Sequence, residues 1–273
     1  MNRKLRLTLV TTLVVAFILF PLYWMLVSAM LPSELVLTRT PPLFPDPRQL
    51  TFDAFEAVLL RRPLLTWVTN SALVAFGSVA ISLVAATLAG YSLSRFRSAA
   101  QEVAGLTLLV GKMLPGSLVV IPLFIMAATF HLIDSRFALM LANASVGVPF
   151  ATWMMKGFFD GIPKDLDAAA RVDGCGRLGV LWHVILPIAR PGIGACSIYL
   201  FIVSWADFVF VRTLVNKPNL WTVTVGLASF MGEHSVDWPQ LMAAGTLSTI
   251  PMLILFLVFE PFLLEGMVSG AVK

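Results

Sequence analysis

Charged and polar residues isolated inside long apolar runs are the positions of this chain best suited to chemistry. Lys112 lies in one such run, directly before Met113-Leu114-Pro115. A charge within a membrane helix is costly and usually faces a cavity or a partner. Lys112 could therefore snorkel or pair inside the protein. Alternatively, it could line a solute path and meet hydroxyls or an anionic group, and for an acidic solute it is the first candidate counter-ion.

Three further polar residues lie in other apolar runs and complete the candidate path. Asn143 and Ser145 share one run, and Asp207 lies in another. Asn143 and Ser145 could form hydrogen bonds between helices, which is common in membranes, or they could contact a solute. For Asp207 we expect an ion pair with Arg212, about one helical turn later along the chain.

Catalytic and cofactor-binding patterns do not occur in the sequence. His131, His183 and His234 stand in separate segments, and Cys175 and Cys196 lack the spacing of metal ligands. The stretch from Gly174 to Gly179 matches the nucleotide fingerprint G-x-G-x-x-G, but no strand is expected before it. We therefore expect no enzyme activity and no bound metal or cofactor. The modest net charge of +4, without an aromatic-rich basic patch, argues against nucleic acid as a partner.

The composition indicates which elements hold these residues. Of the 273 residues, 58% are hydrophobic and only 12% are charged, whereas soluble domains carry about 25% charged residues. Runs of about 20 apolar residues are long enough to span a bilayer as helices. We predict an all-α integral membrane protein with six transmembrane helices. The runs cover residues 7–31, 64–94, 103–130, 137–155, 191–211 and 238–259.

The distribution of Lys and Arg predicts the orientation. These residues are more frequent in the segments on the N-terminal side of the membrane, so we place both termini in the cytoplasm. The first run is too long for a secretory signal, which has an apolar core of roughly 7–15 residues. We expect a first helix and external loop over 1–63, a membrane domain over 64–265 and a cytoplasmic tail over 266–273.

Small residues recur every four positions in the second run, at Ser82, Ala86 and Gly90. Small residues allow helix backbones to approach closely in lipid. The stripe therefore predicts a close helix contact, either inside this chain or with another subunit.

The connection over 156–190 is the longest one expected on the cytoplasmic side. Pro163 suits a helix N-terminus, Asp165 and Asp167 favour the first turn, and Gly174 suits the position after the last turn. A second short helix should follow. Such helices could rest on lipid headgroups, or they could dock a cytoplasmic partner.

This connection resembles the EAA loop of ABC importer permeases. The matching residues are Pro163, Asp165, Leu166, Ala169, Ala170, Asp173 and Gly174, followed by Ile185, Leu186 and Pro187. Ala168 stands where the motif has glutamate, and Cys175 where it has alanine. The resemblance implies that these residues couple the protein to an ATPase.

The resemblance extends over nearly the whole chain and is to the MalG-like permeases of carbohydrate importers. It includes Asn70-Ser71, Ala89-Gly90-Tyr91, Arg95-Phe96, Met113-Leu114-Pro115, Ile133-Asp134, Trp205-Ala206-Asp207-Phe208 and Gly270-Ala271-Val272-Lys273. It implies the MetI-like fold of type I ABC importers in the inner membrane.

The same resemblance implies several partners: a second permease subunit in a heterodimer, an ATPase dimer that holds ATP and magnesium, and an external solute-binding protein. The loop over 232–238 is a candidate contact for the binding protein. The solute could be a neutral carbohydrate, an anionic sugar derivative or a glycerol-phosphate-type compound. A self-contained secondary transporter is the main alternative, although no second repeat is visible.

Overall fold

The chain folds into a helical bundle, described from a computed structural model for residues 3–96, 98–113, 115–232 and 236–271. Side chains are described up to Glu260. Within these residues the only β pairing is an isolated bridge between Met231 and Val236. The all-α fold predicted from the sequence is confirmed.

Four helices are each long and apolar enough to cross a membrane on their own. They are α1 (Arg3–Met30), α4 (Leu64–Arg95), α7 (Arg136–Asp160) and α14 (Trp238–Ala271), the last being tested up to Glu260. Two bent pairs bring the number of described spans to six if each pair counts as one.

The first bent pair divides the run at 103–130, which the sequence suggested as one span. α5 (Ala99–Met113) and α6 (Gly116–Thr129) meet at 104°. Pro115 immediately precedes α6. Proline has no N–H to donate and disfavours helical backbone in the residue before it, so it explains the division.

The second bent pair joins the 177–188 segment to α11 (Arg190–Trp205) at 81°. The 177–188 segment comprises α9 (Arg177–Val180), a π-helical turn η2 (Leu181–Ile185) and α10 (Leu186–Ile188). The run at 191–211 is also interrupted, because α11 ends at Trp205 and α12 (Val209–Leu214) follows after a break at Asp207.

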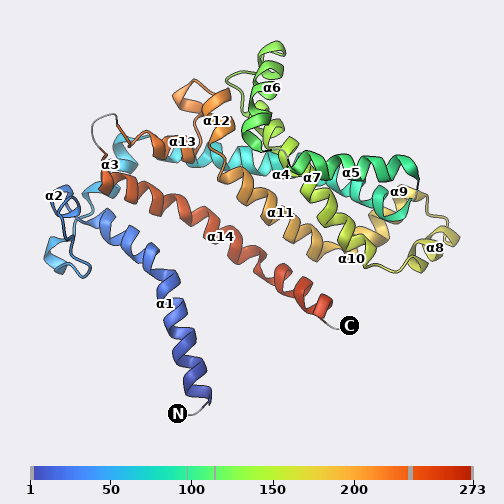
Figure 1. Ribbon diagram of the computed structural model, residues 1–273, viewed down its shortest axis with the longest axis horizontal. Helices are drawn as coiled ribbons and strands as arrows, with labels where there is room; N and C mark the ends of the chain where they lie inside the picture. Colours follow the sequence, from blue (N-terminus) through green and yellow to red (C-terminus); the bar gives the residue numbers. More distant parts are fainter. Residues whose placement is uncertain (1–2, 97, 114, 233–235, 272–273) are drawn as a thin grey trace.

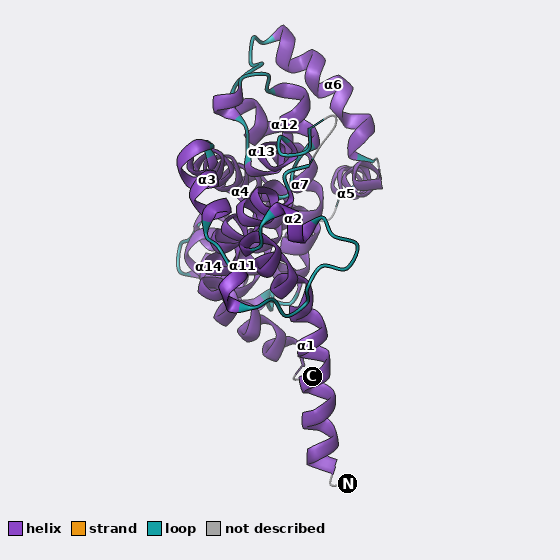
Figure 2. Ribbon diagram, turned by 90° about the vertical axis from the view of Figure 1, so that its left-hand side faces the viewer, coloured by secondary structure: helices purple, strands orange, loops and turns teal. Residues whose placement is uncertain are grey.

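Short elements lie at both ends of the bundle. α8 (Asp165–Val172) is at the end opposite α3 (Asp53–Arg61), and α4 connects the two ends (Figure 1). The remaining elements are α2 (Ser33–Val36), η1 (Pro47–Gln49), η3 (Pro218–Leu220) and α13 (Val223–Ala228). The N-terminal part of α1 extends away from the other helices (Figure 2).

Two segments predicted from the sequence, the C-terminal tail and the loop at 232–238, are described differently or only in part by the structure. α14 continues to Ala271, so helix covers most of the 266–273 segment expected as a tail. Part of the predicted contact loop at 232–238, residues 233–235, lies outside the described residues.

α4 and α7 pack closely along the predicted stripe of small residues. Ser82, Ala86 and Gly90 are all buried, and a Cβ added at Gly90 would lie 3.0 Å from the Cβ of Met155 and the carbonyl oxygen of Thr152. The stripe therefore serves packing within the chain. This contact fixes α4 against α7, whose ends hold the site described below.

We predict that Gly90→Leu lowers the thermal stability of the purified protein, because the larger side chain must push α4 away from α7. Overpacking of this kind costs about 1–3 kcal/mol. Gly157→Leu on α7 is the control, since a Cβ at Gly157 has no atom within 4 Å. Unfolding followed by tryptophan fluorescence in detergent should separate the two variants, and equal midpoints would contradict this packing.

Candidate functional site

α8 is a short helix with one buried face and one exposed face. Asp167 and Ala170 are buried, whereas Leu166 and Ala169 are exposed and Val172 is 88% exposed. An exposed apolar surface of this kind is typical of a contact with another protein. The helix therefore offers apolar side chains outward while its other face anchors it.

Gly174 ends α8 as the sequence predicted. Its φ angle is +89°, a left-handed conformation that residues with a Cβ rarely adopt. The Cys175 N–H donates to the Ala170 carbonyl at 2.9 Å and the Gly174 N–H to the Arg171 carbonyl at 3.1 Å. These two bonds form a Schellman motif, which turns the chain sharply after Asp173.

Arg95, the last residue of α4, anchors the buried face of α8. Its guanidinium lies 3.1 Å from both carboxylate oxygens of Asp167, and the two side chains are 4% and 8% exposed. The same guanidinium donates to the Phe159 carbonyl at 2.8 Å and to the Ile162 carbonyl at 3.1 Å. One side chain thus joins α4, the end of α7 and α8.

Further polar contacts extend this anchor. The Ser94 hydroxyl donates to Asp160 at 2.7 Å and accepts from Arg95 at 3.1 Å. Asp160 also pairs with Lys156 one turn earlier on α7. The Tyr91 hydroxyl lies 3.4 Å from Asp167. We call the Arg95–Asp167 pair, together with the Phe159 and Ile162 carbonyls, the α8 anchor.

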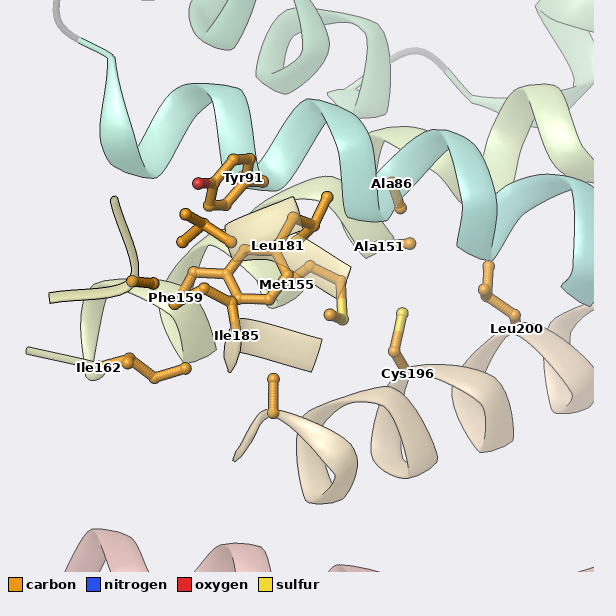
Figure 3. Packing of buried hydrophobic residues seen from close by; sticks show 13 residues of the cluster. Ala86, Tyr91, Ala151, Met155, Phe159, Ile162, Leu181, Ile185, Cys196 and Leu200 are labelled. Atoms are coloured by element: carbon orange, nitrogen blue, oxygen red, sulfur yellow. The ribbon is translucent and has the colours of Figure 1, made fainter. Parts of the chain in front are cut away.

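An apolar cluster of buried residues, which includes Phe159 and Ile162 of the α8 anchor, lies beside it (Figure 3). The Tyr91 ring meets the Phe159 ring edge-on with centroids 6.1 Å apart. Met155, Leu181 and Ile185 fill the space beside them and are fully or nearly fully buried. Ala170 of α8 belongs to the same cluster as residues of α4, α7, η2 and α11, so we expect a movement of α8 to disturb these helices as well.

The sequence missed Arg95 as a member of the site. Arg95 entered only with Phe96 in the family resemblance and among the Lys and Arg residues that predict orientation, and Asp167 only as a charge favourable to a helix N-terminus. One pattern in the sequence could have revealed this contact. Asp167 and Ala170 lie three residues apart and therefore on the same side of α8, which is the buried side. A buried acid requires a buried base nearby.

Of the four candidate path residues, Asn143 and Asp207 lie together. The Asn143 amide donates to Asp207 at 3.3 Å and to the Leu139 carbonyl at 3.0 Å. Asp207 also accepts from the Phe210 N–H at 3.1 Å at the start of α12. The expected Asp207–Arg212 ion pair is wrong, because the break after α11 turns this carboxylate toward the α12 N-terminus.

Lys112 and Ser145 do not join that pair. The Lys112 ammonium lies 3.1 Å from the Tyr199 hydroxyl, and its nitrogen lies over the ring of Phe150 at 5.7 Å. The Ser145 hydroxyl donates to the Ala142 carbonyl at 2.7 Å. Ser145 borders a cavity of about 290 Å³ between α6 and α7. No group of three metal-ligating residues occurs in the part of the chain that the structure describes.

The long apolar helices, with a short helix held against their ends, define a membrane protein with several spans. The family model described as "Binding-protein-dependent transport system inner membrane component" matches residues 78–264. The chain belongs to this family and is a permease of a binding-protein-dependent transport system.

Curated relatives match over nearly their whole length. The chain is 30% identical over 255 residues to the sulfoquinovosyl glycerol transport system permease protein SmoH of Agrobacterium fabrum, covering 93% of this chain and 89% of that protein. It is 31% identical over 264 residues to the diacetylchitobiose uptake system permease protein DasC of Streptomyces coelicolor, covering 96% and 95%.

Solved structures share the fold. A chain of a bacterial ABC transporter involved in import of the acidic polysaccharide alginate has a TM-score of 0.78 at 20% identity, with 96% of this chain and 99% of that chain covered. A chain of the methionine ABC transporter MetNI in an inward-facing conformation has a TM-score of 0.57 at 14% identity, with 79% and 97% covered. The predicted type I importer fold is confirmed.

We predict that Asp167→Ala destabilises the protein near α8, because the Arg95 charge stays buried without its carboxylate. Removing one member of a buried ion pair costs about 3–5 kcal/mol. Limited proteolysis of the 161–176 connection should accelerate strongly. Asp165→Ala, which removes an exposed acid two residues away, is the matched control.

The double variant Arg95→Met with Asp167→Leu should be more resistant to protease than Asp167→Ala, because it leaves no unpaired buried charge. If Asp167→Ala and Asp165→Ala were cleaved at the same rate, the α8 anchor would not hold this helix.

Proposed function

We propose that this permease is driven through α8, which docks on a separate ATPase subunit at the cytoplasmic face. The observation that carries the proposal is that α8 exposes the apolar side chains of Leu166, Ala169 and Val172, whereas its buried face is fixed to two spans by Arg95. A helix that merely rested on lipid would not need a buried ion pair to α4.

The docking surface consists of Leu166, Ala169 and Val172. Pro163, Asp165, Asp173 and Gly174 shape its two ends, and Ala170 lies under it in the core. When the ATPase pair closes on ATP, force on the docking surface reaches α4 and α7 through the α8 anchor. ATP and magnesium are held by the ATPase, and this chain contributes no ligand to them.

A second permease subunit completes the pathway, and we infer a heterodimer. Large apolar side chains of α5 and α6 are exposed, including Leu106, Val110, Met113 and Ile121. Lipid covers part of this surface, and a partner helix covers the rest. The path runs between the two permeases, with Lys112, Asn143, Ser145 and Asp207 as the candidate residues on this side.

The solute is a carbohydrate delivered by an external binding protein. The support comes from relatives over nearly the full chain, whose names specify sulfoquinovosyl glycerol, diacetylchitobiose and maltodextrin. The excess of Lys and Arg in the segments beside α8 supports a cytoplasmic location for this end and for both termini.

We predict that Val172→Glu uncouples the importer, because it puts a charge in the apolar docking surface while leaving the fold intact. The Val172 side chain is 88% exposed, so its replacement costs no packing. Binding-protein-stimulated ATP hydrolysis by the reconstituted complex should fall by roughly tenfold or more.

Val172→Leu is the matched control and should keep stimulated hydrolysis near the unmodified rate, because the surface stays apolar. Unchanged stimulation and uptake in Val172→Glu would refute docking through this face of α8.

A further inference from the structure

We propose that Lys112, with Tyr199 and Phe150, forms a subsite for an anionic group on the transported sugar, so that the solute is an acidic carbohydrate. This inference rests on the proposed function above, since it requires a solute path beside α5. It adds the chemical class of the solute, which the coupling helix does not specify.

Among the residues that the structure describes, the Lys112 ammonium has neutral partners only. It donates to the Tyr199 hydroxyl at 3.1 Å, and its nitrogen lies 5.7 Å and 5.8 Å from the ring centroids of Phe150 and Tyr199. Among the described residues the ion pairs are Arg95–Asp167 and Lys156–Asp160, and neither involves Lys112. An ammonium carries three donors, so two remain for a ligand.

Lys112 lies inside the apolar stretch that α5 and α6 form as a bent pair, one residue before the end of α5. It follows Ala99, the start of α5, by thirteen positions, which corresponds to about 20 Å of helix. The hydrocarbon core of a bilayer is about 30 Å thick. At such depth a charged side chain faces a wet cavity or a partner, because lipid cannot solvate it.

The backbone beside Lys112 is independent evidence for a wet surface. α5 ends one residue later at Met113, and α6 begins at Gly116 at an angle of 104°. Helix breaks at membrane depth occur where the backbone is buried in protein or lines a water-filled cavity. Gly116 and Ser117 are exposed in the single chain, so the break is not buried within this chain and must meet either a partner subunit or a water-filled cavity.

The aromatic partners suit a sugar ring. The Phe150 and Tyr199 rings are 4.2 Å apart between centroids and tilted by 40°, and Phe150 is 39% exposed. Such a pair offers an apolar platform beside two polar donors, the Tyr199 hydroxyl and the Lys112 ammonium. A carboxylate or sulfonate on a sugar would gain a charge-assisted hydrogen bond from this lysine.

An acidic residue of the second permease is the competing partner for Lys112, and the experiment must distinguish it. The complete importer, with both permeases, the ATPases and the binding protein, is reconstituted in proteoliposomes. The binding protein is first screened by calorimetry with paired sugars that differ only in charge, such as glucose- and glucuronate-terminated disaccharides. Uptake of the bound sugars is then measured for Lys112→Gln, Lys112→Arg and the control Lys4→Gln.

We expect the acidic member of a pair to bind and to be transported. Lys112→Gln should lower kcat/KM for its uptake by roughly tenfold, the loss of one charge-assisted contact. Lys112→Arg should retain most of the uptake. Lys4→Gln should match the unmodified importer, and copurification of the second permease should be equal in all four proteins.

Transport of the neutral sugar only, or unchanged uptake of the acidic one by Lys112→Gln, would overturn the inference while leaving the proposed function intact. Loss of the second permease from the Lys112→Gln complex would also overturn it, because the lysine would then pair with that subunit. Absence of any solute-stimulated ATP hydrolysis in the unmodified complex would overturn the proposed function itself, and this inference with it.

Discussion

The guanidinium of Arg95 is the group on which the rest of the site depends. It lies at the end of α4, pairs with the carboxylate of Asp167, and donates to the carbonyls of Phe159 and Ile162. A planar guanidinium with five donors on three nitrogens suits this task, whereas the three donors of a lysine ammonium all lie on a single nitrogen. Because these groups are buried, displacing α8 alone would leave charges and carbonyls unpaired, so helix and spans are expected to move together.

The membrane sets a second constraint, because polar and charged side chains inside apolar spans need partners. Two groups of residues in this chain meet that need differently. The Asn143 amide and the Phe210 N–H at the start of α12 both donate to the Asp207 carboxylate. This carboxylate therefore has hydrogen-bond partners at the break after α11. Lys112, by contrast, meets only a hydroxyl and two rings in the described part of the chain. The polar groups inside the apolar runs thus differ: Asn143 and Asp207 close a helix break, whereas Lys112 keeps donors that no described residue accepts from.

Much of this architecture follows from the sequence, because each signal has a local physical cause. Apolar length predicts the spans, the stripe ending at Gly90 predicts the α4–α7 contact, and Gly174 predicts the end of α8. Arg95 and the break at Asp207 could not be predicted in the same way, since both depend on partners about 70 residues distant in sequence, Asp167 in one case and Asn143 in the other. Local patterns specify elements, whereas buried polar networks specify how those elements meet.

The claim that α8 transmits force from an ATPase to the spans is tested most directly by photo-crosslinking in membranes. A photoreactive amino acid placed at Val172, on the exposed face of α8, should yield a crosslink to the ATPase subunit whose yield changes between the ATP-bound and nucleotide-free states. Crosslinks to lipid or to the second permease alone, unchanged by nucleotide, would contradict this account.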